Sequence, residues 1–134
     1  MPFKISEHTA DLRVELEGRS FEELLLSGFL AVLEVLEIDA SSPAVERVEI
    51  NLRSCDREGL LADWLNELLF HIQTRGLHFA CVEKLQIDGD ELKAVLCAAK
   101  GGVKPAFEIK AATQHELKIE ETEGVLHAAV VFDL

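Results

Sequence analysis

The sequence predicts an α+β fold in a single domain, residues 1–134, in which a mostly antiparallel mixed sheet packs against two amphipathic helices. Two segments, about 20–37 and about 57–75, carry apolar residues at spacings of three and four, which is typical of a helix with one buried face. Most other segments alternate apolar and polar residues, as half-buried strands do. Helices and strands do not follow each other in turn, so the order of elements favours antiparallel pairing over repeated βαβ units.

About seven strands are predicted from the alternation and from the turn sequences between segments. Gly18 ends the second strand, and acidic and glycine residues at 88–90 and 123–124 indicate tight turns between later ones. The predicted strands are 3–8, 12–17, 45–52, 78–88, 91–98, 106–120 and 125–133.

Both predicted helices begin at a capping residue. Ser20 with Glu23 forms the S-x-x-E pattern of a capping box. Asp56 suits the N-cap of the second helix, and Gly76 suits its C-terminal stop. The second helix carries two adjacent rows of apolar residues that each step by four, namely Leu60, Trp64, Leu68 and Ile72, and Leu61, Leu65 and Leu69.

Composition limits the classes of function. The net charge is −12, and the 13 Lys and Arg residues are scattered, so we expect no direct nucleic-acid binding. Such a surface suits metal cations or a basic protein partner. The hydrophobic fraction of 49% is sufficient for a packed core without a disulfide or a structural metal.

We expect a cytoplasmic protein that does not enter a membrane. The N-terminal segment lacks the apolar core of a signal peptide, and no apolar run approaches the roughly 20 residues of a membrane span. Cys55, Cys81 and Cys97 form no C-x-x-C pair and lie in apolar, strand-like contexts, so they are predicted to be small buried residues in a reducing compartment.

The two ends of the chain offer the first candidate sites. His8 and Asp11 are three residues apart at a strand junction, where they can converge on one point or simply cap a turn. Asp133 precedes the carboxylate of Leu134, and two such groups repel each other unless a cation lies between them. Oxygen ligands of this kind suit Ca²⁺, Mg²⁺ or Mn²⁺. The alternative for this end is a frayed, exposed terminus.

Two further groups of polar residues can be either functional or ordinary surface residues. Lys110 and His115 lie on or beside a predicted strand, where they can be functional or ordinary surface residues. Asp63, Glu67 and His71 share one helix face, which can bind a metal or be a solvated polar face. Common nucleotide-binding and hydrolase motifs are absent. The residues alone therefore indicate a small acidic domain with a candidate hard-metal site.

Four motifs taken together resemble the archease family. They are "HTAD" at 8–11, "DWLNELLF" at 63–70, "EIKAATQHEL" at 108–117 and "VVFDL" at 130–134. The resemblance covers essentially the whole chain, and the four motifs follow each other at about the family's separations. Archeases are small cytosolic proteins that assist the GTP-dependent RNA ligase of the RtcB type in tRNA splicing and RNA repair. They promote guanylylation of the ligase on its own histidine and support multiple turnover.

The resemblance implies an accessory activator rather than an enzyme, with the ligase as its protein partner. Asp11, Asp133 and the carboxylate of Leu134 match the family's metal site, which implies a divalent ion, calcium first and Mg²⁺ or Mn²⁺ as alternatives. Lys110, His8 and His115 match motif positions implied in ligase activation. A strand that runs to the last residue is then expected to hold Asp133 and the carboxylate in place, where Asp11 can meet them.

The chain departs from the family pattern in one region. The family's third motif is closer to "KAVTYH", whereas this chain has Ala112 and Gln114 and no Tyr. The segment 97–107 also lacks the "GE" and the Asp/His-containing stretch associated with the family, which implies an altered fit to the partner. Two other functions remain open from the sequence: a general chaperone or protein-modulating adaptor, and a small metal-dependent phosphohydrolase.

Overall fold

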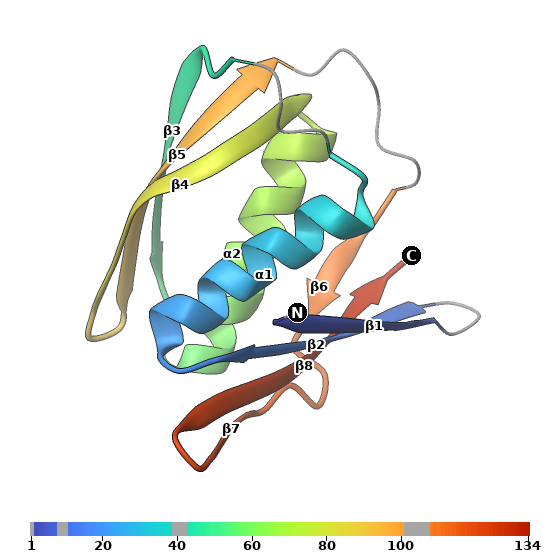
Figure 1. Cartoon of the computed structure of the whole chain (residues 1–134), viewed down its shortest axis with the longest axis vertical. Helices are drawn as coiled ribbons and strands as arrows, with labels where there is room; N and C mark the ends of the chain where they lie inside the picture. The colour runs from blue at the N-terminus through green and yellow to red at the C-terminus, as the bar shows by residue number, and fades with distance from the viewer. Residues whose placement is uncertain (1, 8–10, 39–42, 101–107) are drawn as a thin grey trace.

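The computed structural model describes residues 2–7, 11–38, 43–100 and 108–134. Over these residues the α+β class predicted from the sequence is confirmed (Figure 1). In chain order the elements are β1 (Phe3–Glu7), β2 (Asp11–Gly18), α1 (Phe21–Val35), β3 (Glu46–Arg53), α2 (Arg57–Gln73), β4 (Leu77–Asp88), β5 (Glu91–Lys100), β6 (Ala111–Thr113), β7 (Ile119–Thr122) and β8 (Val125–Asp133).

The strands of the described ranges form two antiparallel sheets, where the sequence predicted one. The larger sheet has the order β1-β2-β8-β6, and β7 also pairs with β8. The smaller sheet has the order β3-β5-β4. The antiparallel pairing is as predicted for every strand pair described. The alternation shows which face of a strand is buried, but it does not show which strand lies beside it.

The two helices lie between the sheets, and each contacts both (Figure 1). α1 packs on β1, β2 and β8 of the larger sheet and on β4 of the smaller one, while α2 packs on β6 and on β3 and β4. Trp64 of α2 is fully buried at the centre, and its indole N–H donates a hydrogen bond of 2.9 Å to the carbonyl oxygen of Leu25 in α1. The predicted apolar rows of α2 therefore form much of the core.

The predicted helix caps are confirmed. The Ser20 side chain accepts a hydrogen bond of 3.1 Å from the N–H of Glu23, and the Asp56 side chain accepts one of 2.7 Å from the N–H of Gly59. Each bond satisfies an N–H group that the first helical turn leaves unpaired. Both helices end two residues earlier than predicted. After α2, Gly76 has a φ of 69°, which supports its predicted role as a helix stop.

The predicted strand 106–120 is wrong as a single element. Within its described part only β6 and β7 are strands, and a turn separates them in which Glu116 has a left-handed φ of 56°. Ile109 and Ala112 are both buried although they are three residues apart, so the segment does not keep the period of two that a continuous strand requires. This irregular segment carries Lys110 and therefore matters for the site.

The prediction of buried cysteines is also wrong. Cys55 and Cys81 are exposed, and Cys97 is half-buried. Cys81 and Cys97 are partners in the register of β4 and β5, and their neighbours Leu96 and Ala98 occupy the face that packs on the helices. Alternate residues of a strand point to opposite faces, so the cysteines are on the outer face.

Candidate functional site

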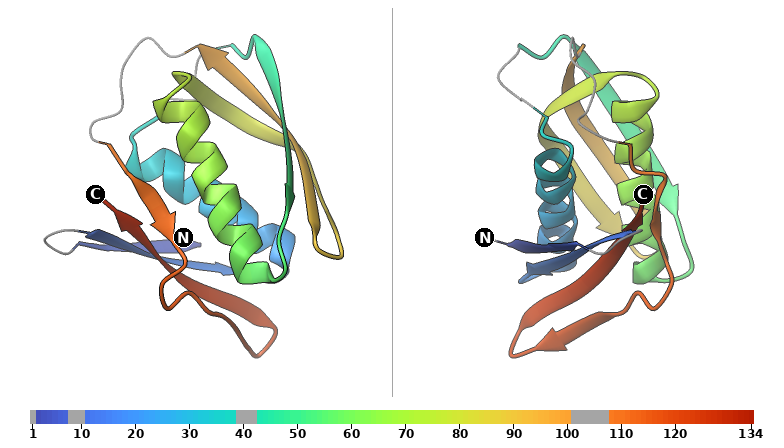
Figure 2. Two further views of the ribbon diagram at one scale, coloured as in Figure 1. Left: turned by 180° about the vertical axis from the view of Figure 1, so that it is seen from behind. Right: turned by 90° about the vertical axis from the view of Figure 1, so that its right-hand side faces the viewer.

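The two acidic residues predicted at the ends of the chain lie side by side in the larger sheet. Asp11 is the first residue of β2 and Asp133 the last of β8, and the antiparallel register pairs them directly. On the other side of β8, the register pairs Asp133 with Ala111 of β6. Figure 2 shows the start of β6 beside the end of β8. Asp133 therefore occupies the central strand of three at this end of the sheet.

The carboxylates of Asp11 and Asp133 belong to the outer face of the sheet. Their neighbours Leu12 and Phe132 are buried against the helices, so the acids are on the opposite face. Residues directly opposite each other in an antiparallel pair share a face, with Cβ atoms about 4.5–5.5 Å apart. Two like charges in this position repel each other and destabilise the folded state. A cation or a basic group between them makes the net electrostatic interaction favourable.

Lys110 is held next to this pair by the main chain. Its N–H donates a hydrogen bond of 2.7 Å to the carbonyl oxygen of Asp133. The Lys110 residue itself is exposed, and so is Leu134, which follows Asp133 and is 38% accessible. One end of the sheet thus gathers Asp11, Asp133, Leu134 and Lys110, four of the predicted site residues.

Of the two predicted histidines, only His115 belongs to the described residues, and it does not lie with these four. His8 lies outside the described residues. His115 lies in the turn after β6, and because β6 runs antiparallel to β8, each residue beyond Ala111 lies farther along β8 from Asp133. The His115 side chain is 84% exposed, and its ring Nε2 is 3.8 Å from a carboxylate oxygen of Glu116. The geometry gives His115 no contact with the carboxylate pair.

Asp63, Glu67 and His71 of α2 do not form the solvated polar face that was one of the two alternatives from the sequence. His71 is buried, with its Nε2 3.4 Å from a Glu67 carboxylate oxygen and its Nδ1 3.0 Å from a nitrogen of Arg75. Burial lowers the pKa of His71. The Glu67 carboxylate raises this pKa and the Arg75 guanidinium lowers it, each by less than burial does. Burial also raises the pKa of Asp63. These residues are part of the packing of α2.

Metal ligation by side chains alone has no support in the described part of the chain, where no group of three or more His, Cys, Asp or Glu could hold a metal ion. The predicted site has a different donor set: two side-chain carboxylates, Asp11 and Asp133, and the main-chain carboxylate of Leu134. Oxygen donors of this kind fit a hard divalent cation, and Ca²⁺ in particular tolerates irregular geometry. The residues present therefore fit the implied metal.

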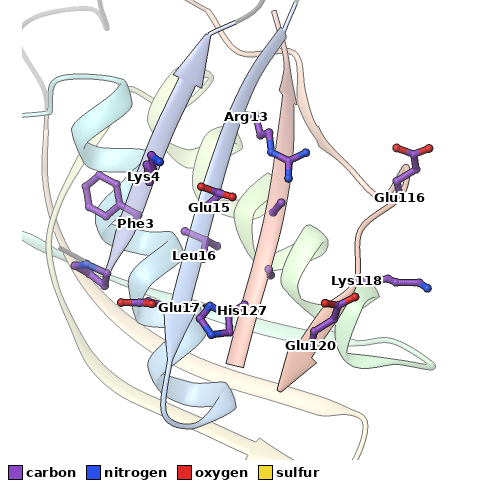
Figure 3. A pocket seen from close by; sticks show the side chains of 13 residues that line it. Phe3, Lys4, Arg13, Glu15, Leu16, Glu17, Glu116, Lys118, Glu120 and His127 are labelled. Atoms are coloured by element: carbon purple, nitrogen blue, oxygen red, sulfur yellow. Dashed lines mark ion pairs between the residues drawn. The ribbon is translucent and has the colours of Figure 1, made fainter. Parts of the chain in front are cut away.

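A pocket of about 560 Å³ lies elsewhere on the same outer face. Residues of β1, β2, β7 and β8 line it, and Figure 3 shows acidic and basic side chains interspersed around it. His127 of β8 is 3.9 Å from Glu17 of β2, measured from Nδ1 to a carboxylate oxygen. Asp11, Asp133 and Lys110 are not among the lining residues, so this pocket and the carboxylate pair are separate features.

Two amide side chains of α2 contact the main chain of residues 109–112, called here the Lys110 segment. This contact was not predicted from the sequence. Asn66 and Gln73 each form two hydrogen bonds to the main chain of one residue, Ala112 and Ile109 respectively. The available signal was their spacing of seven residues, which places both on one side of the helix. Among the helices described here, none is long and apolar enough to cross a membrane.

Comparisons with known proteins agree on one family. The family model described as the archease protein family matches residues 3–134. A protein archease of Methanosarcina mazei is 33% identical over 98% of this chain and 95% of its own length. One of Methanopyrus kandleri is 33% identical over the whole of both chains.

Two solved structures resemble the fold described above. The solution structure of Methanobacterium thermoautotrophicum protein 1598 has a TM-score of 0.75 and 33% identity, and 99% of each chain is covered. The crystal structure of a Thermotoga maritima protein, described as an archease and possible chaperone, has a TM-score of 0.71 and 34% identity. It covers 98% of this chain and 96% of that one.

Proposed function

Because the chain belongs to the archease family, we propose that it acts as an accessory activator of an RtcB-type GTP-dependent RNA ligase and is not itself an enzyme. The observation that carries this proposal is the pairing of Asp11 with Asp133 beside the main chain of Lys110. Carboxylates and a lysine gathered at one sheet end are groups that neutralise and orient a charged partner site. The proposed setting is the cytoplasm, and the three free cysteines suit a reducing compartment.

The proposed cofactor is a divalent cation, calcium first, bound by Asp11, Asp133 and the carboxylate of Leu134. When bound, the ion would supply positive charge at an otherwise self-repelling cluster. The carboxylates would hold it on the outer face of the sheet, where a partner protein can reach them. The Lys110 ammonium is on an exposed residue next to this cluster and would carry a second positive charge to the same place.

The proposed mechanism is positioning of the ligase's nucleotide and metals while its histidine attacks the nucleotide phosphate. In-line phosphoryl transfer depends mainly on alignment and on neutralisation of charge. A surface with a net charge of −12 would also be drawn to a basic, metal-rich ligase cleft. The protein would do this without binding RNA directly. His8 and His115 remain proposed contributors to activation through their motif positions alone.

A guanylylation assay with purified RtcB-type ligase and GTP tests the proposal. Wild-type protein should accelerate guanylylation, and the Asp11→Asn and Lys110→Ala variants should lose most of the acceleration. Glu15→Gln is the matched control, because Glu15 is another acid on the outer face of β2 and lies away from Asp133 in the register. Variants at Asp11 and Lys110 that stimulate as well as the wild type would show that this sheet end does not activate the ligase.

A broader chaperone activity is the second candidate, since the Thermotoga maritima relative is described as a possible chaperone. This function predicts salt-sensitive binding to unrelated basic proteins and suppression of their aggregation. Selective stimulation of the ligase, with no effect on unrelated clients, would argue against it.

A further inference from the structure

The short strand β6 has a protein partner on both of its edges, and one partner is a side chain. On one edge β6 pairs with β8. On the other, the N–H of Ala112 donates to Oδ1 of Asn66 at 2.8 Å, and Nδ2 of Asn66 donates to the carbonyl oxygen of Ala112 at 3.0 Å. The Asn66 amide thus makes the pair of bonds that a neighbouring strand would make, and it satisfies main-chain groups that an edge strand leaves open.

Gln73 makes the same pair of bonds to Ile109, three residues before Ala112 in the chain. The N–H of Ile109 donates to its Oε1 at 2.7 Å, and its Nε2 donates to the carbonyl oxygen of Ile109 at 2.8 Å. Seven residues of helix rise about 10.5 Å, and three extended residues span roughly 10 Å. The spacing of Asn66 and Gln73 on α2 therefore matches the spacing of Ala112 and Ile109, which lets each amide reach its own main-chain partner.

Lys110 and Ala111 are the two residues between these attachment points. Ala111 is the register partner of Asp133, and the Lys110 N–H donates to the Asp133 carbonyl oxygen. The amides consequently hold the backbone on one edge while Asp133 holds it on the other. α2 itself is anchored independently of them, because its apolar residues Trp64, Leu65, Leu68 and Leu69 are buried in the core.

We propose that Asn66 and Gln73 are positioning residues, whose amides fix the Lys110 segment against the end of β8 and so set the place of Lys110 relative to the Asp11–Asp133 pair. The inference rests on the proposed function for its consequence in ligase activation. The arrangement also assigns a role to the Asn of the "DWLNELLF" motif, which contacts the "EIKAATQHEL" motif directly.

The sharpest variant is Asn66→Asp, which keeps the shape of the side chain. An ionised carboxylate only accepts hydrogen bonds, so the Ala112 carbonyl oxygen loses its donor and meets a negative charge. Gln73→Glu makes the same change at Ile109. Thr74→Ala is the control, since Thr74 is an exposed residue at the C-terminal end of α2.

Two measurements are made on the full chain. Amide hydrogen exchange at Lys110 reports whether the segment stays bonded to Asp133, and the amide of Val14 in β2 is the internal reference. Stimulation of ligase guanylylation is measured with the concentration of activator varied, so that the half-maximal concentration and the maximal rate are separated. We expect both acidic variants to speed exchange at Lys110 by at least roughly tenfold while Val14 is unchanged. We expect the maximal stimulation to fall in the same variants, and Thr74→Ala to match the wild type.

The outcomes separate the inference from the proposed function. Unchanged exchange at Lys110 in both acidic variants would overturn the positioning role, whatever the ligase does. Faster exchange with undiminished stimulation would also overturn it. If the wild-type protein stimulates no ligase while the variants speed exchange at Lys110, the proposed activity fails and the positional role of the amides stands.

Discussion

Asp11 and Asp133 face each other in the register of β2 and β8, although they lie near opposite ends of the chain. Both carboxylates belong to the outer face, because Leu12 and Phe132 occupy the inner one. The folded sheet therefore brings together two like charges that are far apart in the unfolded chain. A protein built in this way should respond strongly to a cation at that position, and to changes of either acid.

Calcium should stabilise the wild-type protein and have little effect on Asp11→Asn. A ligand that binds only the folded state at a hundred times its dissociation constant stabilises by about 2.7 kcal/mol. In a domain of this size that corresponds to a rise of about 10 °C in the melting temperature. Thermal unfolding with calcium and with a chelator measures this difference. Without divalent ions, Asp11→Asn should melt no lower than the wild type, because the repulsion is relieved; an equal calcium shift in both proteins would contradict the site.

Extension of the chain beyond Leu134 should weaken calcium binding. A short tag converts the carboxylate of Leu134 into a neutral amide and removes one proposed oxygen ligand. The same tag placed before Met1 leaves this carboxylate intact and serves as the control. Isothermal titration with calcium should show a dissociation constant raised at least roughly tenfold for the C-terminal tag only. Equal affinities in the two tagged proteins would exclude the Leu134 carboxylate as a ligand.

His71 should make the folded state less stable as the pH falls below about 6.5, its ordinary pKa. Burial lowers its pKa in the folded protein, so in this window the unfolded chain binds a proton that the folded chain does not. The stability that the neutral His71 contributes is fully present above pH 6.5 and is lost as the pH falls through the lower folded pKa. Urea unfolding between pH 7.5 and 5.5 should therefore show a steeper loss for the wild type than for His71→Gln. His115→Gln, which changes an exposed ring, should behave as the wild type.

Cys97 should react slowly with iodoacetamide at pH 8. Its hydrogen bond to the Glu83 carboxylate is the main cause that raises the pKa of the Cys97 thiol to about 12, and burial and the neighbouring Cys81 add to it. The thiolate is the reactive form, so little of Cys97 is available to react. Glu83→Gln removes the charge and should speed alkylation of Cys97, as measured by mass spectrometry of timed samples. The exposed Cys55 is the internal reference, and unchanged Cys97 kinetics in Glu83→Gln would show that Glu83 has no such effect.

Local patterns were sufficient for the helices and for the first strands. Ser20 and Asp56 cap the helices as predicted, and the apolar rows of α2 are buried around Trp64. These features depend on residues three or four positions apart, which the sequence displays directly. The same reasoning failed at 106–120, because the period of two breaks between Ile109 and Ala112 and the segment is held by side chains of α2.

The candidate site residues were predicted mainly through their motifs. The resemblance named Asp11, Asp133, Leu134 and Lys110 together, whereas spacing along the chain left each of them with an ordinary alternative. Asn66 and Gln73 were missed because an amide on a half-buried helix face looks like any polar residue until its partner is known. His71 was misjudged for a similar reason: its position on α2 suggested a polar face, and the packing of Phe79 against its ring decided otherwise.

The sequence by itself determined the α+β class, the two helices with their caps, the alternation of the first strands and the family. The tertiary structure decided the division into two sheets, the pairing of Asp11 with Asp133 and the attachment of β6 to α2 through Asn66 and Gln73. Helix and strand patterns arise from interactions between near neighbours, so one segment is enough to reveal them. Strand register and amide–backbone bonds join residues far apart in the chain, and they are selected only when the whole core packs.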